Sequence, residues 1–213
     1  MKDFVITAKN NPKIKDIKAL LTSSKDRKNS ELFVLEGVRL CCDAVKSGCE
    51  ITSVFCTENC AEKYADSINE LKSACSDFYF VSEDVLKSIS DTVTPQGVVC
   101  AVKMRSNDFE YESGKRYIAL DTIQNPDNLG AISRTAEAFG IDGMIICGGC
   151  DIYNPKALRA SMGALCIIGN EGNGVSKDII DACDEKITIK MQGRAESLNA
   201  AAAASITMWE LVK

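Results

Sequence analysis

Three short segments of the chain place amide, carboxylate, guanidinium and hydroxyl groups beside glycine or alanine, a combination suited to binding and catalysis. They read NPDNLGAISRTAEAFG from Asn125, IGNEGNG from Ile168 and ESLNAAAAAS from Glu196. Each comes after an apolar run that is typical of a buried strand. In open parallel sheets, ligands bind at the carboxyl ends of the strands. The three segments together therefore predict one ligand site at one edge of a sheet.

The glycine-rich segment limits the kind of ligand. Its glycines, at 169, 172 and 174, do not follow the G-x-G-x-x-G pattern, and no Lys-Ser or Lys-Thr pair follows them. Glu171, in the centre of the loop, would repel a pyrophosphate. A cationic sulfonium such as S-adenosylmethionine fits this charge better than NAD or ATP does. A simple tight turn between a strand and a helix is the alternative interpretation.

The chain contains no histidine, which excludes Ser-His-Asp and Cys-His arrangements and imidazole metal ligands. Any proton transfer must use Arg, Lys, Asp, Glu, Tyr or Cys. The first segment carries a single arginine, Arg134, in a helical pattern that follows a strand.

Eleven cysteines are distributed over the 213 residues, several of them where a small buried apolar residue would fit. A secreted scaffold would be shorter and would space its cysteines more regularly, so we expect reduced thiols in the core. Cys147 and Cys150 form a C-x-x-C pair, and Cys56 and Cys60 form a looser one. A zinc site or a redox pair is the alternative, but neither pattern is specific, and we expect no metal.

The charge of the chain is unevenly distributed. The net charge is −5, yet residues 1–30 carry eight Lys and Arg against three Asp. Such a basic end can bind phosphates; the alternative is a solvated helix face. No apolar run reaches the roughly 20 residues of a membrane span, and the N-terminus has no signal-peptide core, so we expect a soluble cytoplasmic protein. The candidate RNA-binding residues are Lys15, Lys18, Arg27, Lys28 and Arg39.

Alternating strand and helix patterns divide the chain into two α/β halves. Residues 1–105 predict strands at LFVLEG, ITSVFC, FYFVS and QGVVCAVK, and helices at the basic N-terminal segment, VRLCCDAVKSG, AEKYADSINELKSAC and SEDVLKSIS. Residues 106–116 are polar and form the predicted linker. Residues 117–213 predict short apolar strands flanked by helices, which indicates a mainly parallel sheet buried on both faces.

Two positions in the second half carry specific predictions. Ser197 stands where the N-cap of a helix over the alanine run would be. At Leu165–Cys166, a predicted helix meets a predicted strand with no turn between them, although connections in α/β units usually take a few residues. We therefore predict that residues are missing between Leu165 and Cys166.

In chain order, the three segments resemble the three signature motifs of the SpoU/TrmH family of S-adenosylmethionine-dependent RNA ribose 2′-O-methyltransferases. The resemblance covers residues 117–213 closely, and it is specific because three separate motifs match. Residues 1–105 resemble more loosely, through EGVRL and TPQGVVCAV, a substrate-binding domain related to small RNA-binding ribosomal proteins. Relatives carry several tens of residues between Gly163 and Cys166, which agrees with the missing segment.

The resemblance implies a fold, a cofactor and a set of site residues. The C-terminal half would be an α/β trefoil knot, a rare exception to the rule against knotted chains. The protein would be a homodimer whose sites borrow residues from the partner subunit. S-adenosylmethionine would be held, without a metal, by Gly148, Gly169, Gly172, Ile189 and Leu198. Arg134 would be the catalytic arginine, surrounded by Asn128, Glu171, Ser197 and Asn199.

Two roles remain open for Arg134. A ribose 2′-hydroxyl is a weak nucleophile near neutral pH and must lose its proton as it attacks. A free guanidinium, whose pKa lies above ~12, is a poor base. Arg134 either loses its proton in a special environment, as the resemblance implies, or stays charged. In the second case it stabilises the developing alkoxide while a phosphate or Glu171 takes the proton.

The main hypothesis is an RNA 2′-O-methyltransferase, and the two-domain layout favours ribosomal RNA over transfer RNA. A transfer-RNA 2′-O-methyltransferase is one alternative. A non-catalytic RNA-binding protein of the same fold is another, and it would not bind S-adenosylmethionine. A third is a nucleotide-dependent redox enzyme that uses Cys147 and Cys150.

Overall fold

The computed structural model describes residues 5–105, 112–161, 189, 191–192 and 197–213, with the side chain of residue 161 left aside. The chain divides into two compact units. Unit 1 comprises Met1–Phe109 and Tyr153–Pro155, and unit 2 comprises Glu110–Ile152 and Lys156–Lys213. Each unit is an assembly of strands and helices with its own core, as the α/β prediction requires.

Unit 1 is built on a mixed five-stranded sheet with the order β1-β4-β3-β5-β2. β4 runs parallel to β1 and β3, whereas β5 is antiparallel to β3 and β2. The strands are β1 Val5–Ile6, β2 Leu32–Glu36, β3 Ile51–Cys56, β4 Cys75–Val81 and β5 Val98–Lys103.

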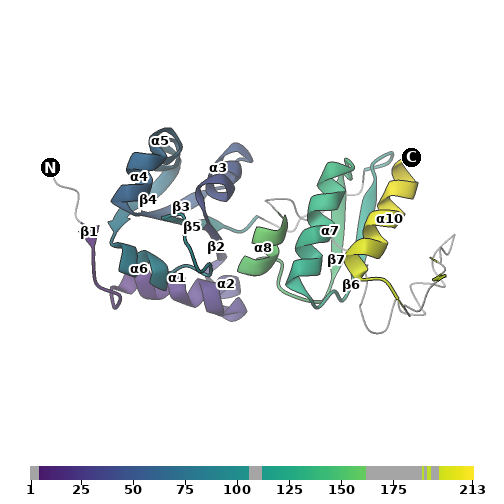
Figure 1. The fold of residues 1–213 in the computed structure, drawn as a ribbon, viewed down its shortest axis with the longest axis horizontal. Coiled ribbons are helices and arrows are strands. Elements are labelled where there is room, and N and C mark those ends of the chain that lie inside the picture. The colour runs from purple at the N-terminus through teal and green to yellow at the C-terminus, as the bar shows by residue number, and fades with distance from the viewer. Residues whose placement is uncertain (1–4, 106–111, 162–188, 190, 193–196) are drawn as a thin grey trace. The chain divides into compact units, whose positions relative to one another are not determined.

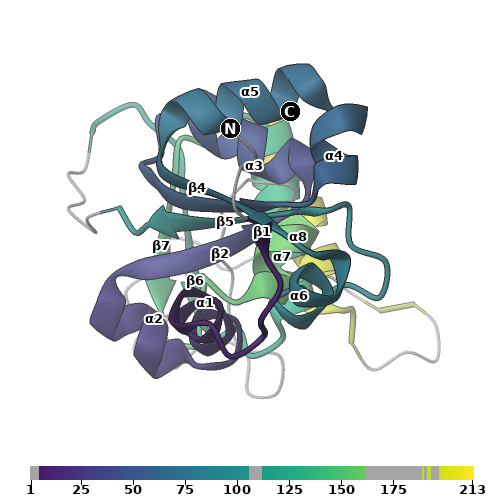
Figure 2. The ribbon, with the colours of Figure 1, turned by 90° about the vertical axis from the view of Figure 1, so that its left-hand side faces the viewer.

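Helices cover both faces of this sheet, which makes unit 1 a three-layer structure (Figure 2). One face carries α1 Pro12–Thr22, α2 Ser24–Ser30 and α6 Glu83–Ser88. The other face carries α3 Val38–Lys46, α4 Glu58–Lys63 and α5 Ala65–Ala74. β5 lies between the two layers, and its residues Val98–Val102 are all buried. A strand buried on both faces reads as a continuous apolar run, as VVCAV does.

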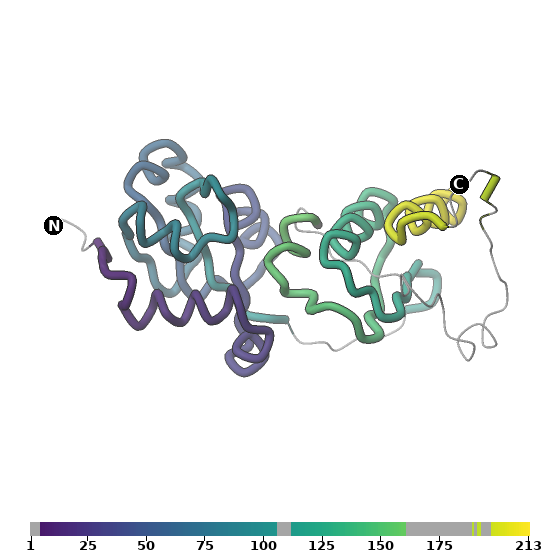
Figure 3. The backbone as a smooth tube through the Cα atoms, turned by 60° about the horizontal axis from the view of Figure 1, so that its bottom comes forward, coloured from purple at the N-terminus to yellow at the C-terminus, as the bar shows by residue number. Residues whose placement is uncertain are grey.

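Unit 2 contains a pair of parallel strands, β6 Tyr117–Asp121 and β7 Gly143–Cys147. Its described helices are α7 Pro126–Ala138, α8 Pro155–Ser161 and α10 Ala200–Val212. α7 and α10 contact each other along their length, as Figures 1 and 3 show. The core they enclose joins Ile118 and Leu120 of β6 to Ile132 of α7 and Met208 of α10.

The sequence correctly predicts the parallel pairing in unit 2, but burial on both faces does not hold for the described strands. Ile118 and Leu120 are buried, whereas Ala119 between them is exposed, and so are Ile145 and Cys147 of β7. This alternation belongs to a sheet with one covered face. The predicted strands at LCIIG and KITIK lie outside the described residues, apart from Ile189, which is in no regular element.

Two predicted helices of unit 1 are each divided. The basic N-terminal segment forms α1 and α2, because Ser23 is extended and its side chain caps α2 by accepting from the Asp26 N–H at 3.2 Å. The predicted helix at residues 61–75 begins earlier and breaks at Tyr64, which separates α4 from α5. The two-residue strand β1 was not predicted. Within the described residues, no helix has both the length and the apolar composition to cross a bilayer.

Candidate functional site

The carboxyl ends of β6 and β7 are tied together by backbone hydrogen bonds. The Thr122 N–H donates to the Cys147 carbonyl at 2.8 Å, and the Cys150 N–H donates to the Ile123 carbonyl at 2.7 Å. Thr122 has a φ of 53°, which is uncommon for a β-branched residue. Strained backbone of this kind clusters at functional sites. The loops after β6 and β7 are therefore held together at one edge of the sheet. This is the edge at which the sequence predicts the ligand site.

The two glycines after β7 differ in what surrounds them. A Cβ on Gly149 would lie 2.4 Å from the Ile123 carbonyl oxygen, so this residue is small because the neighbouring loop packs against it. Among the described residues, a Cβ on Gly148 would meet the Thr122 side chain, at 3.1 Å, and the φ of 71° at Gly148 itself favours glycine. Gly148 lies at the sheet edge, and its contact with a cofactor stays a prediction. Gly149 was not predicted as a site residue, although the Gly-Gly pair after a strand was a visible signal.

The first segment begins α7 at the same edge. The Asn125 side chain accepts from the Asp127 N–H at 2.8 Å and caps the helix, and Pro126 occupies its first turn. Asparagine is favoured at the N-cap because its side chain accepts from an N–H that has no partner within the helix. Proline is favoured in the first turn because it has no N–H that would need a partner. The cap explains why the segment opens with Asn-Pro, and it places Asn128 in the first turn of α7.

Asn128 and Asn199 contact each other directly. The Asn199 Nδ2 donates to the Asn128 Oδ1 at 2.8 Å, across 71 positions of sequence. The first and third segments, predicted to meet, are therefore brought together. The prediction that Ser197 caps the last helix is wrong: the cap is Asn199, whose Oδ1 accepts from the N–H groups of Ala201 and Ala202 at 2.9 and 3.4 Å.

Arg134 lies on the exposed side of α7, whose buried side includes Leu129, Ile132 and Ala136. Its side chain makes no hydrogen bond or ion pair with the residues that the structure describes. The guanidinium is therefore exposed on α7, and its catalytic role stays a prediction. Packing does not account for an arginine at this position.

The remaining predicted site residues divide into two groups. Ser197 and Leu198 are exposed just before the Asn199 cap, and Ile189 is half-buried. Leu198, 37% exposed, is an apolar side chain that does not pack into the core. Gly169, Glu171 and Gly172 lie outside the described residues.

The predicted RNA-binding cations of unit 1 are not equivalent. Lys15, Lys28 and Arg39 are exposed and Lys18 is half-buried. Arg27 is only 3% exposed, and its guanidinium donates to the Leu20 carbonyl at the end of α1. The last carbonyls of a helix have no partner within the helix, and Arg27 supplies one. The structure therefore corrects the expectation for Arg27: its side chain connects α1 to α2 and is not presented to RNA.

The described cysteines are all free thiols, and Cys41, Cys42, Cys56, Cys60 and Cys100 are buried, as expected of core residues. Burial raises the pKa of the Cys100 thiol well above its ordinary value, which keeps it neutral. Within the part of the chain that the structure describes, no three Cys, Asp or Glu side chains are grouped closely enough to hold a metal ion.

Comparison with known families accounts for both units. The sequence model described as the SpoU rRNA Methylase family matches residues 115–168 and 164–209. The one described as the MRM3-like substrate binding domain matches residues 11–100. Residues 115–209 therefore belong to the SpoU rRNA Methylase family, and the relatives of the chain are RNA methyltransferases.

Individual relatives cover almost the whole chain. A 23S rRNA (guanosine(2553)-2′-O)-methyltransferase of Bacillus subtilis is 27% identical over 252 residues, covering 97% of this chain and 98% of the relative. A 23S rRNA (uridine(2479)-2′-O)-methyltransferase of Streptomyces viridochromogenes is 25% identical, covering 95% and 90%. The crystal structure of an AdoMet-bound rRNA methyltransferase from Sinorhizobium meliloti superposes with a TM-score of 0.85 at 25% identity, covering 99% and 97%.

The comparisons also bear on the predicted missing segment. The alignment with the Bacillus relative extends over 252 positions, at least 39 more than the 213 residues of this chain. The two segments matched by the family model meet at residues 164–168. Leu165–Cys166 falls within that overlap, and its peptide bond lies outside the described residues. Relatives therefore carry residues that this chain lacks.

Proposed function

We propose that the chain transfers a methyl group from S-adenosylmethionine to a ribose 2′-hydroxyl, with ribosomal RNA as the substrate class. The observation that carries the proposal is the hydrogen bond between Asn128 and Asn199, which joins two of the three motifs at the start of α7 and α10. The names of the Bacillus and Streptomyces relatives, both 23S rRNA 2′-O-methyltransferases, support this substrate.

The residues present fit the methyl donor. Gly148 lies at the sheet edge, Leu198 offers an exposed apolar side chain, and Ile189 is half-buried. S-adenosylmethionine, when bound, supplies an electrophilic methyl group on a sulfonium. A donor of this charge needs no cluster of cations around it, unlike NAD or ATP.

The bound donor would supply its methyl group to the ribose oxygen and leave as S-adenosylhomocysteine, and a phosphate of the RNA or Glu171 would take the hydroxyl proton. Arg134, on the exposed side of α7, is the group we assign to the ribose oxygen. A charged guanidinium there stabilises the developing alkoxide. The hydrogen bond between Asn128 and Asn199 fixes the direction of both amides at the start of two helices, as a preorganised site requires.

We assign RNA capture to residues 1–105 and catalysis to residues 117–213, with 106–116 as the linker. The family matches at 11–100 and 115–209 support this division. We also propose the trefoil knot and the homodimer that the family resemblance implies. Exposed apolar side chains on α10 support the homodimer, since Ile206, Trp209 and Leu211 are 43%, 54% and 59% exposed. The free thiols fit a cytoplasmic location.

The second candidate is a non-catalytic RNA-binding protein, because this chain lacks residues that its relatives carry. Binding of S-adenosylmethionine distinguishes the two candidates. Isothermal calorimetry of the full chain with S-adenosylmethionine should show saturable binding to one site per chain. No binding would favour the second candidate. Mapping 2′-O-methyl positions in total RNA from a strain lacking the protein would identify the substrate. If the missing methyl group lies in transfer RNA, the substrate is transfer RNA and not ribosomal RNA.

A further inference from the structure

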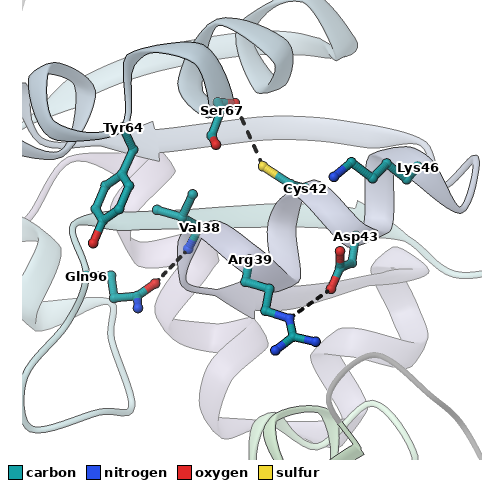
Figure 4. A pocket seen from close by; sticks show the side chains of 8 residues that line it. All are labelled: Val38, Arg39, Cys42, Asp43, Lys46, Tyr64, Ser67 and Gln96. Carbon is teal, nitrogen blue, oxygen red and sulfur yellow. Dashed lines mark hydrogen bonds and ion pairs between the residues drawn. The ribbon is translucent and has the colours of Figure 1, made fainter. Parts of the chain in front are cut away.

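A pocket of about 290 Å³ lies on unit 1, which contains none of the three motifs. It is formed between α3 and the junction of α4 and α5, with Gln96 from the loop before β5 closing one end (Figure 4). Ligand pockets begin at about 300 Å³, so this one suits a ligand the size of a single nucleotide. It is lined by Val38, Arg39, Cys42, Asp43, Lys46, Tyr64, Ser67 and Gln96.

The floor of the pocket is uncharged. Val38 is 8% exposed and Cys42 is 5% exposed. Burial raises the pKa of the Cys42 thiol, which donates a weak hydrogen bond to the Ser67 carbonyl at 3.9 Å. Because the thiol stays neutral, the floor accepts the face or edge of a flat, weakly polar group.

An aromatic ring forms one wall. Tyr64 ends α4 and precedes α5, with φ −124° and ψ 43°, so the chain leaves the helical path at this residue. The break turns the ring toward Gln96 (Figure 4). The ammonium of Lys63 lies 5.3 Å from the ring centroid. Since Lys63 is exposed and flexible, it can leave the ring face to a base or pair with its phosphate.

Polar groups at both ends suit a sugar-phosphate. The Gln96 Oε1 accepts from the Val38 N–H at 2.9 Å, which orients the amide so that its NH₂ remains free to donate. Arg39 and Lys46 are exposed along α3, and Asp43 pairs with Arg39 at 3.6 Å. Arg39 keeps donors beyond that ion pair, because its guanidinium has five. The lining carries one net positive charge in a chain of net charge −5.

We propose that this pocket binds one unpaired nucleotide of the substrate RNA, with the base stacked on Tyr64, its edge on the Gln96 amide and its phosphate on Arg39 and Lys46. The proposal rests on the proposed function, because it takes RNA as the substrate. A single-stranded nucleotide fits better than a duplex, since stacking on an aromatic side chain needs an unstacked base.

The test compares single-stranded with double-stranded RNA. The full chain is titrated into a short fluorescein-labelled RNA strand and into its duplex, and anisotropy gives both affinities. Tyr64→Ala should weaken single-strand binding about tenfold, as expected for one base–aromatic stack, and leave duplex binding unchanged. Tyr64→Phe, which keeps the stacking face, should bind like the wild type. Lys87→Ala, an exposed cation on α6 outside the pocket, is the control for charge.

Several outcomes would overturn the proposal. If Tyr64→Ala binds single-stranded RNA with wild-type affinity, or loses the same affinity for the single strand and the duplex, the pocket does not recognise single-stranded RNA. If free adenosine monophosphate binds as tightly as the labelled strand, the ligand is a free nucleotide and not RNA. A methyl-transfer assay on the same preparations separates the two proposals. If Tyr64→Ala binds normally and the wild type still methylates RNA, the pocket assignment fails and the proposed function stands.

Discussion

Asn199 connects two helices through a single side chain: its Nδ2 donates to the Asn128 Oδ1 at 2.8 Å, and its Oδ1 accepts from the Ala201 N–H at 2.9 Å. The first function fixes α10 against the first turn of α7. The second caps α10. One asparagine thus both starts a helix and brings two sequence motifs together, which explains why an asparagine and not a serine performs the capping.

The two functions of Asn199 can be separated by substitution. Asn128→Ala removes the interhelical bond but leaves the α10 cap intact, whereas Asn199→Ala removes both. We expect Asn199→Ala to be less stable than Asn128→Ala by about 1 kcal/mol, the usual value of an N-cap. Chemical denaturation followed by circular dichroism measures this difference. Equal stabilities would mean that the cap contributes nothing, and Asn199→Ser, which restores only the cap, should recover the difference.

Arg134 should be needed for turnover but not for folding. Its side chain is exposed and unpaired among the described residues, so Arg134→Ala should leave the melting temperature unchanged. We expect methyl transfer to fall at least ~100-fold, the scale of losing one group that stabilises an oxyanion. Arg134→Lys tests whether charge alone is enough. Arg116→Ala, also exposed in unit 2, is the matched control. Near-wild-type rates in both Arg134 variants would show that Arg134 is not catalytic.

Arg27 and Lys28 are adjacent cations with opposite expected roles. Arg27→Ala leaves the buried Leu20 carbonyl without its donor and should destabilise unit 1 by about 3 kcal/mol. Lys28→Ala should change stability by less than ~0.5 kcal/mol, because Lys28 is exposed. Thermal or urea unfolding of the full chain gives both values. If Lys28→Ala proved the more destabilising of the two, the structural role of Arg27 would be refuted.

The exposed cations of the N-terminal helices should contribute electrostatically to RNA affinity. Binding of single-stranded RNA should weaken linearly on logarithmic axes as salt rises, with a slope of about −0.7 per phosphate contacted. Reversing Lys15, Lys18 and Lys28 to Glu should make that slope less steep by up to ~2. Reversing Lys87 instead should leave it unchanged. A slope that is identical in all variants would place the RNA elsewhere.

Acid stability of unit 2 should depend on Asp142. The Asp142 carboxylate accepts the Arg116 backbone N–H at 2.9 Å and pairs with Lys115 at 3.5 Å, and both interactions hold its pKa below the ordinary value. A lowered pKa stabilises the fold above the unfolded-state value, about 3.9, and this stabilisation is lost as the pH falls through the folded-state pKa. Asp142→Asn should therefore lower the melting temperature at pH 7. The drop in melting temperature between pH 7 and pH 3 should be smaller in this variant than in the wild type. An unchanged pH profile would contradict this.

The sequence predicts the strands of unit 1 well where the apolar pattern is unambiguous. VVCAV, buried throughout in β5, shows this. The pattern does not show β1, because Val5 and Ile6 become a strand only by pairing with Phe80 and Val81 of β4. It also misses the break at Tyr64, since alanine, glutamate and lysine around it all favour a continuous helix.

The candidate site shows the same limit. Ser197 and Asn199 have nearly equal N-cap preferences, so local propensity could not choose between them. The choice is made by the Asn128 side chain, 71 positions away in sequence. Arg27 was likewise assigned by charge alone, and its burial depends on how α2 turns back onto the end of α1. Sequence thus identifies the motifs, and tertiary contacts decide which side chain performs each task.

The most direct test of the central claim is the chemical identity of the methylated product. The full chain is incubated with S-adenosylmethionine carrying a labelled methyl group and with ribosomal RNA transcribed without modifications, and the RNA is digested to nucleosides for mass spectrometry. The account predicts a single labelled 2′-O-methyl nucleoside with the wild type and its loss with Arg134→Ala. A label on a base, or no transfer from a chain that binds the donor, would contradict it.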